Sequence, residues 1–193
     1  MADPTITSPK RSPFTLGWIA LVVLSVIISH FVANYEQFLP YHWRTYTAPD
    51  GSFSVQFPDK PSVVPTQVPF GSGGTTTIDF ITANPTTHTA YSCFYFDQES
   101  IVGKSPNEVL GAARDGSLRK VQGTLLTEKR IEVEGYPALD TQASARGNSL
   151  FDSRIIVAGK RIYMITAIAT AKEDREAKTV KRVMDSFKIL RKQ

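Results

Sequence analysis

The chain has 193 residues, of which 41% are hydrophobic and 21% are charged, and its formal net charge at pH 7 is +4. This composition is ordinary for a globular protein and argues against a disordered chain. The positive charge is concentrated in residues 172–193, while the rest is balanced, so we predict no domain-wide basic surface for nucleic acid. The single cysteine, Cys93, excludes an intrachain disulfide and a cysteine-based zinc cluster.

An uncharged, almost wholly apolar run, Phe14–Ala33, follows a polar tail of residues 1–13. At about 1.5 Å rise per residue, its roughly 20 residues form a helix of about 30 Å, the thickness of a bilayer's hydrocarbon core. We therefore predict a single transmembrane helix. Lys10 and Arg11 precede it, which favours a cytoplasmic N-terminus in the inner (plasma) membrane and a periplasmic or extracellular C-terminal domain.

A cleaved signal peptide is the alternative for this segment, because its charge pattern and position also fit one. Two observations favour a retained anchor. Phe31 lies two residues before Ala33, where a cleavage site needs a small side chain, and the run is longer than the usual hydrophobic region of about 7–15 residues.

The next ten residues, 34–43, are rich in aromatic side chains. Such side chains gather where hydrocarbon meets lipid headgroups, so we interpret this stretch as an interfacial linker. A hydrophobic linker that packs on the following domain is the other interpretation, and the two are compatible. The aromatic residues concerned are Tyr35, Phe38, Tyr41 and Trp43.

Residues 44–193 have the pattern of one domain that begins with β-strands. Asp50-Gly51 predicts a hairpin turn, after which Phe53, Val55 and Phe57 alternate with polar residues as in a half-buried strand. Three further strands are expected. They are Val63–Phe70, Thr75–Thr82 and Thr89–Asp97, the first two joined by the glycine-rich stretch 71–74, which lacks the lysine of a phosphate-binding loop.

The second half of the domain predicts a helix, a strand meander and a final helix. Ser105, Pro106 and Glu108 have the pattern of a capping box, and the helix is expected to end near Gly123. Turns with glycine, about twelve residues apart, then predict four antiparallel strands, the last of which, Arg161–Thr170, should lie inside the sheet. The turns are Glu134-Gly135, Gly147-Asn148 and Gly159-Lys160.

The final helix is expected from about Glu173 to Ile189. Its apolar residues recur at helical spacing and should face the core, while its basic residues face outward. The basic face is either a solvated surface or a site for an anionic partner or lipid headgroups. The outward residues are Arg175, Lys178, Lys181, Arg182 and Lys188.

The sequence shows no catalytic signature, and we predict no catalytic, cofactor-binding or metal-binding residues and no cofactor. The histidines, at positions 30, 42 and 88, are dispersed and none has the spacing of a metal site. Cys93 lies in the middle of an apolar strand, where a buried free thiol is the expected state.

A series of motifs across residues 44–190 resembles the PsbP-like family. The motifs are Tyr46-x-x-Pro49-Asp50-Gly51-x-Phe53-Ser54-Val55-x-Phe57-Pro58-x-x-Pro61, Ala112-Ala113-Arg114-Asp115-Gly116, Gly135-Tyr136-Pro137-Ala138, Arg154, Gly159-x-Arg161-x-Tyr163 and Asp185-Ser186-Phe187. The resemblance implies an α+β fold, an antiparallel sheet of about seven to nine strands packed with two main helices in an α/β/α sandwich. It also implies a non-catalytic accessory or binding module. No photosystem-contacting residue of the family is matched here.

Together, these observations predict a single-pass membrane protein that carries a PsbP-like domain outside the cytoplasm and serves as a non-catalytic interaction or assembly subunit. Its expected partners are the bilayer and another membrane protein or complex. A domain that binds a small molecule or lipid is the alternative, and an enzyme with an unrecognised site is the more remote one.

Overall fold

The structure is a computed structural model that describes residues 41–70 and 74–190. The predicted membrane helix, Phe14–Ala33, lies outside the described residues, as do Tyr35 and Phe38. Within the described ranges, no helix is long and apolar enough to cross a membrane. Residues 41–193 separate from residues 1–40 as a unit with its own internal contacts.

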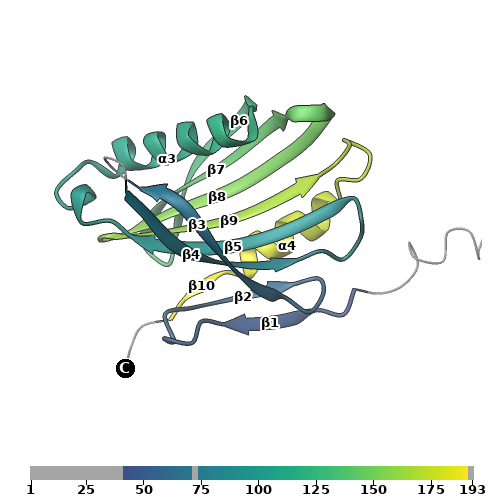
Figure 1. Cartoon of the computed structure of the whole chain (residues 1–193), viewed down its shortest axis with the longest axis horizontal. Coiled ribbons are helices and arrows are strands. Elements are labelled where there is room, and N and C mark those ends of the chain that lie inside the picture. Colours follow the sequence, from purple (N-terminus) through teal and green to yellow (C-terminus); the bar gives the residue numbers. More distant parts are fainter. Residues whose placement is uncertain (1–40, 71–73, 191–193) are drawn as a thin grey trace, which may run out of the picture. The chain divides into compact units, whose positions relative to one another are not determined.

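A seven-stranded antiparallel sheet forms the centre of this unit (Figure 1). Its strand order, β3-β4-β5-β9-β8-β7-β6, confirms the predicted meander and places the last long strand between two others. Alternation along these strands gives the sheet two apolar faces, and each face packs against a different helix. The strands are β3 (Ser62–Phe70), β4 (Gly74–Ala83), β5 (Thr89–Asp97), β6 (Thr124–Val133), β7 (Tyr136–Ala145), β8 (Ser149–Ala158) and β9 (Arg161–Ala169).

One face of the sheet is covered by α3 (Pro106–Val121), which packs on β7 and β8. The helix begins with the predicted capping box, in which the backbone N–H of Ser105 donates to Glu108 Oε2 at 3.1 Å. It ends at Gln122, and a Cβ on the next residue, Gly123, would lie 2.6 Å from the carbonyl oxygen of Ser144. A glycine is therefore required at this close approach of helix and sheet.

The opposite face packs against α4 (Ala177–Ser186) and a small three-stranded sheet. That sheet has the order β1-β2-β10, with bounds β1 (Arg44–Thr47), β2 (Phe53–Phe57) and β10 (Lys188–Ile189). The Asp50-Gly51 hairpin joins β1 and β2 as predicted. The α+β fold class is thus confirmed, with two short 3₁₀ helices, Glu99–Ile101 and Arg146–Asn148, in addition.

The predicted extent of the final helix, 173–189, was wrong at both ends. Before α4 begins, Arg175 is drawn toward the sheet by the carboxylate of Asp152. After it ends, Phe187 adopts an extended backbone and is buried, and Lys188 and Ile189 pair with β2. Burial of the ring and the new strand hydrogen bonds outweigh the local preference for helix.

Aromatic side chains fill the core on the α4 face. The ring of Phe53 is fully buried. Its centroid lies 5.4 Å from that of Tyr95, 5.5 Å from that of Phe187 and 5.7 Å from that of Tyr163. Cys93 is also fully buried in this core, and its burial raises the pKa of the thiol. The predicted role of Cys93 as a small buried apolar residue is therefore confirmed.

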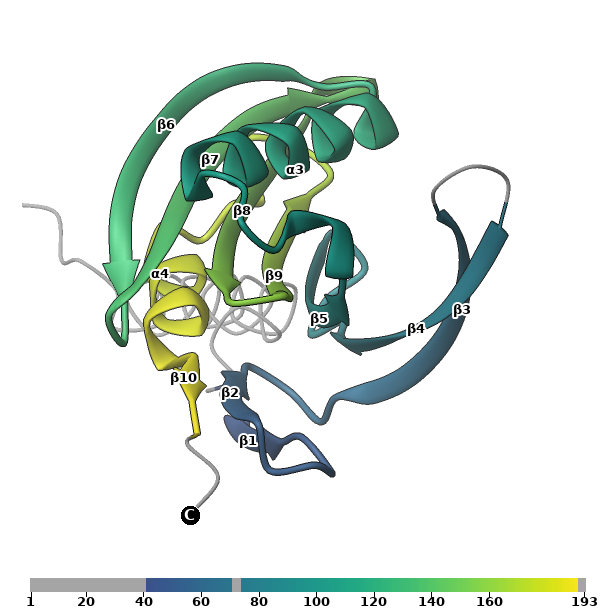
Figure 2. The ribbon, with the colours of Figure 1, turned by 90° about the vertical axis from the view of Figure 1, so that its left-hand side faces the viewer.

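The β3–β4 hairpin extends away from the rest of the sheet, as Figure 2 shows. β3 and β4 pair along nine positions, from Ser62 with Thr82 to Phe70 with Gly74. β4 pairs with β5 at only three positions, from Ile81 with Cys93 to Ala83 with Tyr91. Among the described residues, no third strand pairs with the outer part of this hairpin. Val63 and Val64, near its base on the edge strand β3, are each 48% exposed.

Candidate functional site

A groove of about 400 Å³ lies between α4 and the strands β6, β7 and β8. Among the strands, α4 packs most closely on β2 and β9, and the groove lies on the side of the helix toward β6 and β7. Its lining combines apolar side chains with charges of both signs. The residues that line it are Lys129, Ile131, Asp140, Thr141, Asp152, Ser153, Arg154, Arg175, Ala177, Val180, Lys181, Met184 and Asp185.

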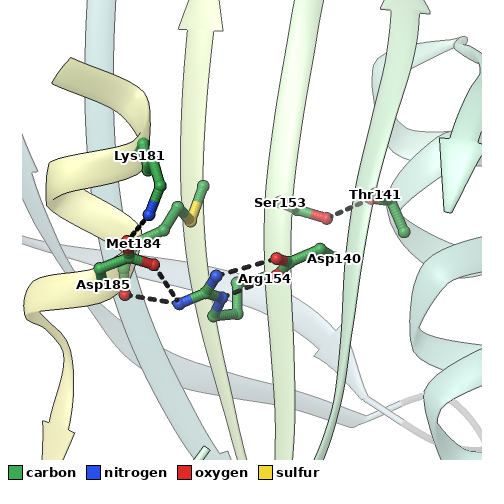
Figure 3. Close-up of polar contacts among 7 residues, drawn as sticks. All are labelled: Asp140, Thr141, Ser153, Arg154, Lys181, Met184 and Asp185. Carbon is green, nitrogen blue, oxygen red and sulfur yellow. Dashed lines mark hydrogen bonds and ion pairs between the residues drawn. The ribbon is translucent and has the colours of Figure 1, made fainter. Parts of the chain in front are cut away.

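Arg154 connects the sheet to α4 at the floor of the groove (Figure 3). Its Nε and Nη2 donate to Asp140 Oδ1 and Oδ2 at 2.7 and 2.8 Å, a two-pronged contact set by the β7–β8 register, which places these residues opposite each other. Its Nη1 donates to the backbone oxygen of Met184 at 2.9 Å and to Asp185 Oδ1 at 3.3 Å. The guanidinium thus satisfies a carbonyl at the C-terminal end of α4, where cations are favoured.

Electrostatics favour the charged forms of Arg154 and Asp185. Burial disfavours the charge of Arg154, but hydrogen bonds to Asp140 and its negative charge outweigh burial and raise the pKa of the guanidinium. Burial likewise disfavours the charge of Asp185, yet hydrogen bonding from Lys181 and the nearby charge of Arg154 lower the pKa of that carboxyl. Groups with these shifts hold their charges at neutral pH, so they suit positioning and recognition rather than proton transfer.

A second ion pair lies at the other end of α4. Arg175 Nε and Nη2 donate to the two carboxylate oxygens of Asp152 at 2.8 and 2.9 Å, and Gln142 Nε2 donates to the same carboxylate at 3.0 Å. The sequence had assigned Arg175 to the water-facing side. Instead, it fixes the turn that leads into α4, because Asp152 is 92% buried and needs a charged partner.

Two hydroxyl groups near the groove belong to the other face of the sheet. Thr141 and Ser153 are hydrogen-bonded to each other at 2.7 Å and are buried. Their positions alternate with Asp140 and Arg154, and they share the face of Leu139 and Ile155, which pack under α3. Their hydroxyl groups are therefore turned away from the groove (Figure 3).

The last residues of the predicted linker contact α4 directly. The hydroxyl of Tyr41 donates to Glu176 Oε1 at 2.7 Å, and the guanidinium of Arg182 lies 3.8 Å from the centroid of the Trp43 ring. The rings of Tyr41 and Trp43 meet edge to face at 6.3 Å. These two aromatic residues thus pack on the domain, and their position at a membrane interface stays a prediction.

The sequence predicted no site residues, and it missed the groove. The available signal was a pair of charged residues, Asp140 and Arg154. Each lies two positions along its strand from a core residue, Ala138 or Ile156, and therefore on the same face of the sheet. Of the described histidines, His42 is exposed, and His88 Nδ1 is hydrogen-bonded to Thr170 Oγ1 at 3.3 Å. No group of three or more metal-binding side chains occurs in the part of the chain that the structure describes.

No protein-family model matches this sequence, and no curated protein sequence matches it. Among solved structures, the solution structure of cyanobacterial PsbP (CyanoP) from Synechocystis sp. PCC 6803 matches with a TM-score of 0.54, at 11% identity, over 79% of this chain and 95% of that one. The domain has a PsbP-like fold. This confirms the resemblance carried by the sequence motifs, and at this identity the likeness concerns the fold alone.

Two further solved structures are similar to the PsbP-like domain at lower scores. One, from Bacteroides thetaiotaomicron, has a TM-score of 0.45 and 13% identity over 78% of this chain and 49% of that one. The other, a Pseudomonas aeruginosa protein of unknown function, has a TM-score of 0.36 and 16% identity over 69% and 85% of the two chains.

Proposed function

We propose that this protein is a non-catalytic accessory module, anchored in a membrane by residues 14–33, that docks a protein of a membrane complex through the groove beside α4. The observation that carries the proposal is the Arg154 network. It presents a guanidinium and carboxylates that are fixed by four hydrogen bonds and line an open groove. A surface fixed in this way binds with little ordering cost, because its side chains are already held in place.

The composition of the groove supports a protein partner. Half-buried Ile131 supplies apolar surface above the largely buried Val180 and Met184, and the exposed Lys129, with Lys181 beside its partner Asp185, adds positive charge at the edge. Protein interfaces combine an apolar centre with charges that select the partner and its orientation. The partner we expect therefore inserts an apolar side chain flanked by acidic residues.

The fold and the sequence support an accessory role at a membrane. The PsbP-like fold suggests a non-catalytic module, and the apolar run Phe14–Ala33 would keep the domain beside the bilayer. A partner that is itself a membrane protein would meet the domain at high local concentration, so even a weak contact through the groove would be populated.

Photo-crosslinking tests this proposal. A benzophenone amino acid at Lys181, on the edge of the groove, is expected to give a discrete adduct with another protein in native membranes. The same amino acid at Arg119, exposed on α3, is the control and should give none. Equal adducts at both positions, or an adduct only at Arg119, would rule out the groove as the docking site.

A small anionic ligand is the second candidate for the groove. The volume of about 400 Å³ lies within the range of small-molecule sites, and Lys129 and Lys181 supply cations at the edge. An anionic ligand should raise the melting temperature of the wild-type protein, since it binds the folded state alone. The double variant Lys129→Ala, Lys181→Ala should lose that shift, and an unchanged shift would place the ligand elsewhere.

A further inference from the structure

The outer side of α4 carries a cationic stripe that the groove does not use. Lys178 and Arg182 are both exposed and lie one helical turn apart, while Thr179, Val180 and Val183 are buried. These two cations therefore point away from the core. Lys181 and Asp185, which line the groove, occupy the adjacent strip of the helix.

Among the described residues, neither Lys178 nor Arg182 forms an ion pair, because the nearby carboxylates on α4 have other partners. Glu176 accepts hydrogen bonds from the hydroxyl groups of Tyr41 and Thr179 at 2.7 and 2.9 Å. Asp185 is held by Arg154 and Lys181. Arg182 contacts only the neutral Gln56 amide, at 3.4 Å, and the Trp43 ring in the interactions that the structure describes, so the stripe keeps its positive charge for an external partner.

The described end of the linker is held on α4. Tyr41 and Trp43 are held on α4 by the hydrogen bond to Glu176 and by the stacked guanidinium of Arg182. Only residues 34–40 separate this point from Ala33, the end of the apolar run. Seven residues span at most about 25 Å when fully extended, so an anchored chain keeps α4 within that distance of the hydrocarbon core.

We infer that the stripe of Lys178 and Arg182 rests on the anionic headgroups of the membrane that anchors the chain. The inference rests on the anchoring stated under the proposed function and adds the lipid class and the face that meets it. Cations near an anionic bilayer surface each strengthen binding by about fivefold, and amphipathic rings such as Trp43 favour the same depth. The groove then opens beside the bilayer, where a neighbouring membrane protein can enter it.

Fluorescence of Trp43 in the full chain tests this contact. The chain has two tryptophans, so the variant Trp18→Phe leaves Trp43 as the only one. This protein is reconstituted in vesicles of phosphatidylcholine, with and without phosphatidylserine, that contain a lipid with a nitroxide on its headgroup. We expect phosphatidylserine to increase quenching of Trp43 by about threefold or more, and added salt to reverse the increase.

Charge variants assign the effect to the stripe. In the Trp18→Phe background, Lys178→Glu, which leaves Arg182 stacked on Trp43, should abolish the increase on adding phosphatidylserine. The matched variant Lys104→Glu changes the net charge equally at an exposed position outside α4, and should keep it. If both variants keep the increase, or if phosphatidylserine has no effect in the parent, the inference is wrong, and an acidic protein segment becomes the partner to test.

Alkaline carbonate extraction separates this outcome from a failure of the proposed function. A chain anchored by residues 14–33 stays in the membrane pellet at high pH, whatever the stripe does. Release into the supernatant would overturn the anchoring itself. Retention in the pellet without phosphatidylserine-dependent quenching would overturn only the headgroup contact.

Discussion

The two faces of the large sheet are built on different principles. The α3 face packs one helix on β7 and β8 through a mainly aliphatic core that includes Leu110, Leu139 and Ile155. The α4 face is aromatic and assembles segments from both ends of the domain, β1 and β2 with α4 and β10. It also holds the ion pairs of Arg154 and Arg175.

This difference indicates that the α3 face mainly stabilises the fold, whereas the ion pairs of the α4 face hold α4 in place. A buried ion pair stabilises a fold less well than apolar side chains of the same volume, because both charges lose their hydration. The α3 face has an apolar core and its ion pair, Arg114 with Glu128, is partly exposed. Arg154 is only 12% exposed, so its network is better explained by the need to hold α4 at one angle beside the groove.

Replacement of the central ring on the α4 face should have the largest effect. Phe53→Ala is expected to lower the free energy of unfolding by about 3–5 kcal/mol, because a fully buried ring that contacts several others leaves a large cavity. On the α3 face, Leu110→Ala removes a smaller side chain and should cost about 2–4 kcal/mol. Urea denaturation measures both. A larger loss for Leu110→Ala would reverse the proposed ranking of the two cores.

Loss of the arginine in the groove should come next. Arg154→Met is expected to cost about 2 kcal/mol, because the carboxylates of Asp140 and Asp185 lose a common partner. Its control on the α3 face, Arg114→Met, removes a more exposed guanidinium, 23% against 12% for Arg154, and should cost about 0.5 kcal/mol or less. Hydrogen exchange should also show faster opening of α4 in the first variant only, and equal losses would refute the distinction.

Acid should weaken the hairpin of β1 and β2 before it weakens the α3 face. The hydrogen bond from Arg161 lowers the pKa of Asp97 despite partial burial, and the same guanidinium contacts Asp50 at 3.1 Å on that hairpin. A lowered carboxyl pKa gives stability above its ordinary value of 3.8, and this stability is lost as the pH falls toward the lowered value. The variant Arg161→Gln should flatten this part of the pH–stability curve, measured by denaturation at each pH. If Arg161→Gln leaves the loss of stability at low pH unchanged, other carboxylates cause that loss.

The smallest expected change concerns the start of α3. Glu108→Ala removes a hydrogen bond to the backbone of Ser105 and an acidic group from the first helical turn, at a cost of about 0.5 kcal/mol. Thermal unfolding can resolve this difference. The α4 groove should be unaffected, so crosslinking from Lys181 serves as the check that the two faces are independent.

Local signals were enough to predict most of the fold. The turn at Asp50-Gly51, the capping box at Ser105 and the evenly spaced turns of the meander act over a few residues, and each appeared where expected. The end of α4 could not be predicted, because the extended conformation of Phe187 depends on the ring of Phe53, far away in the sequence.

The groove was unpredictable for the same reason. Its central contacts join Asp140 and Arg154 on neighbouring strands to Asp185 on a helix, and they form only once the strand register and the helix position are set. A charged residue at an inward strand position marks a place where the core pattern is broken. It does not identify the partner that compensates for the charge.

The pairing of β10 with β2 has a consequence for biosynthesis. β2 leaves the ribosome before the large sheet is made, but its partner β10 is made only after all the strands of that sheet. The backbone N–H of Leu190 donates to the carbonyl of Ser52 at 2.8 Å, and that of Gln56 donates to the hydroxyl of Ser186 at 2.8 Å. The α3 half can therefore form before β10 is made, whereas the aromatic core must wait for that segment. Until then a nascent chain would hold Phe53 and its neighbours exposed, so this half is the one more open to aggregation.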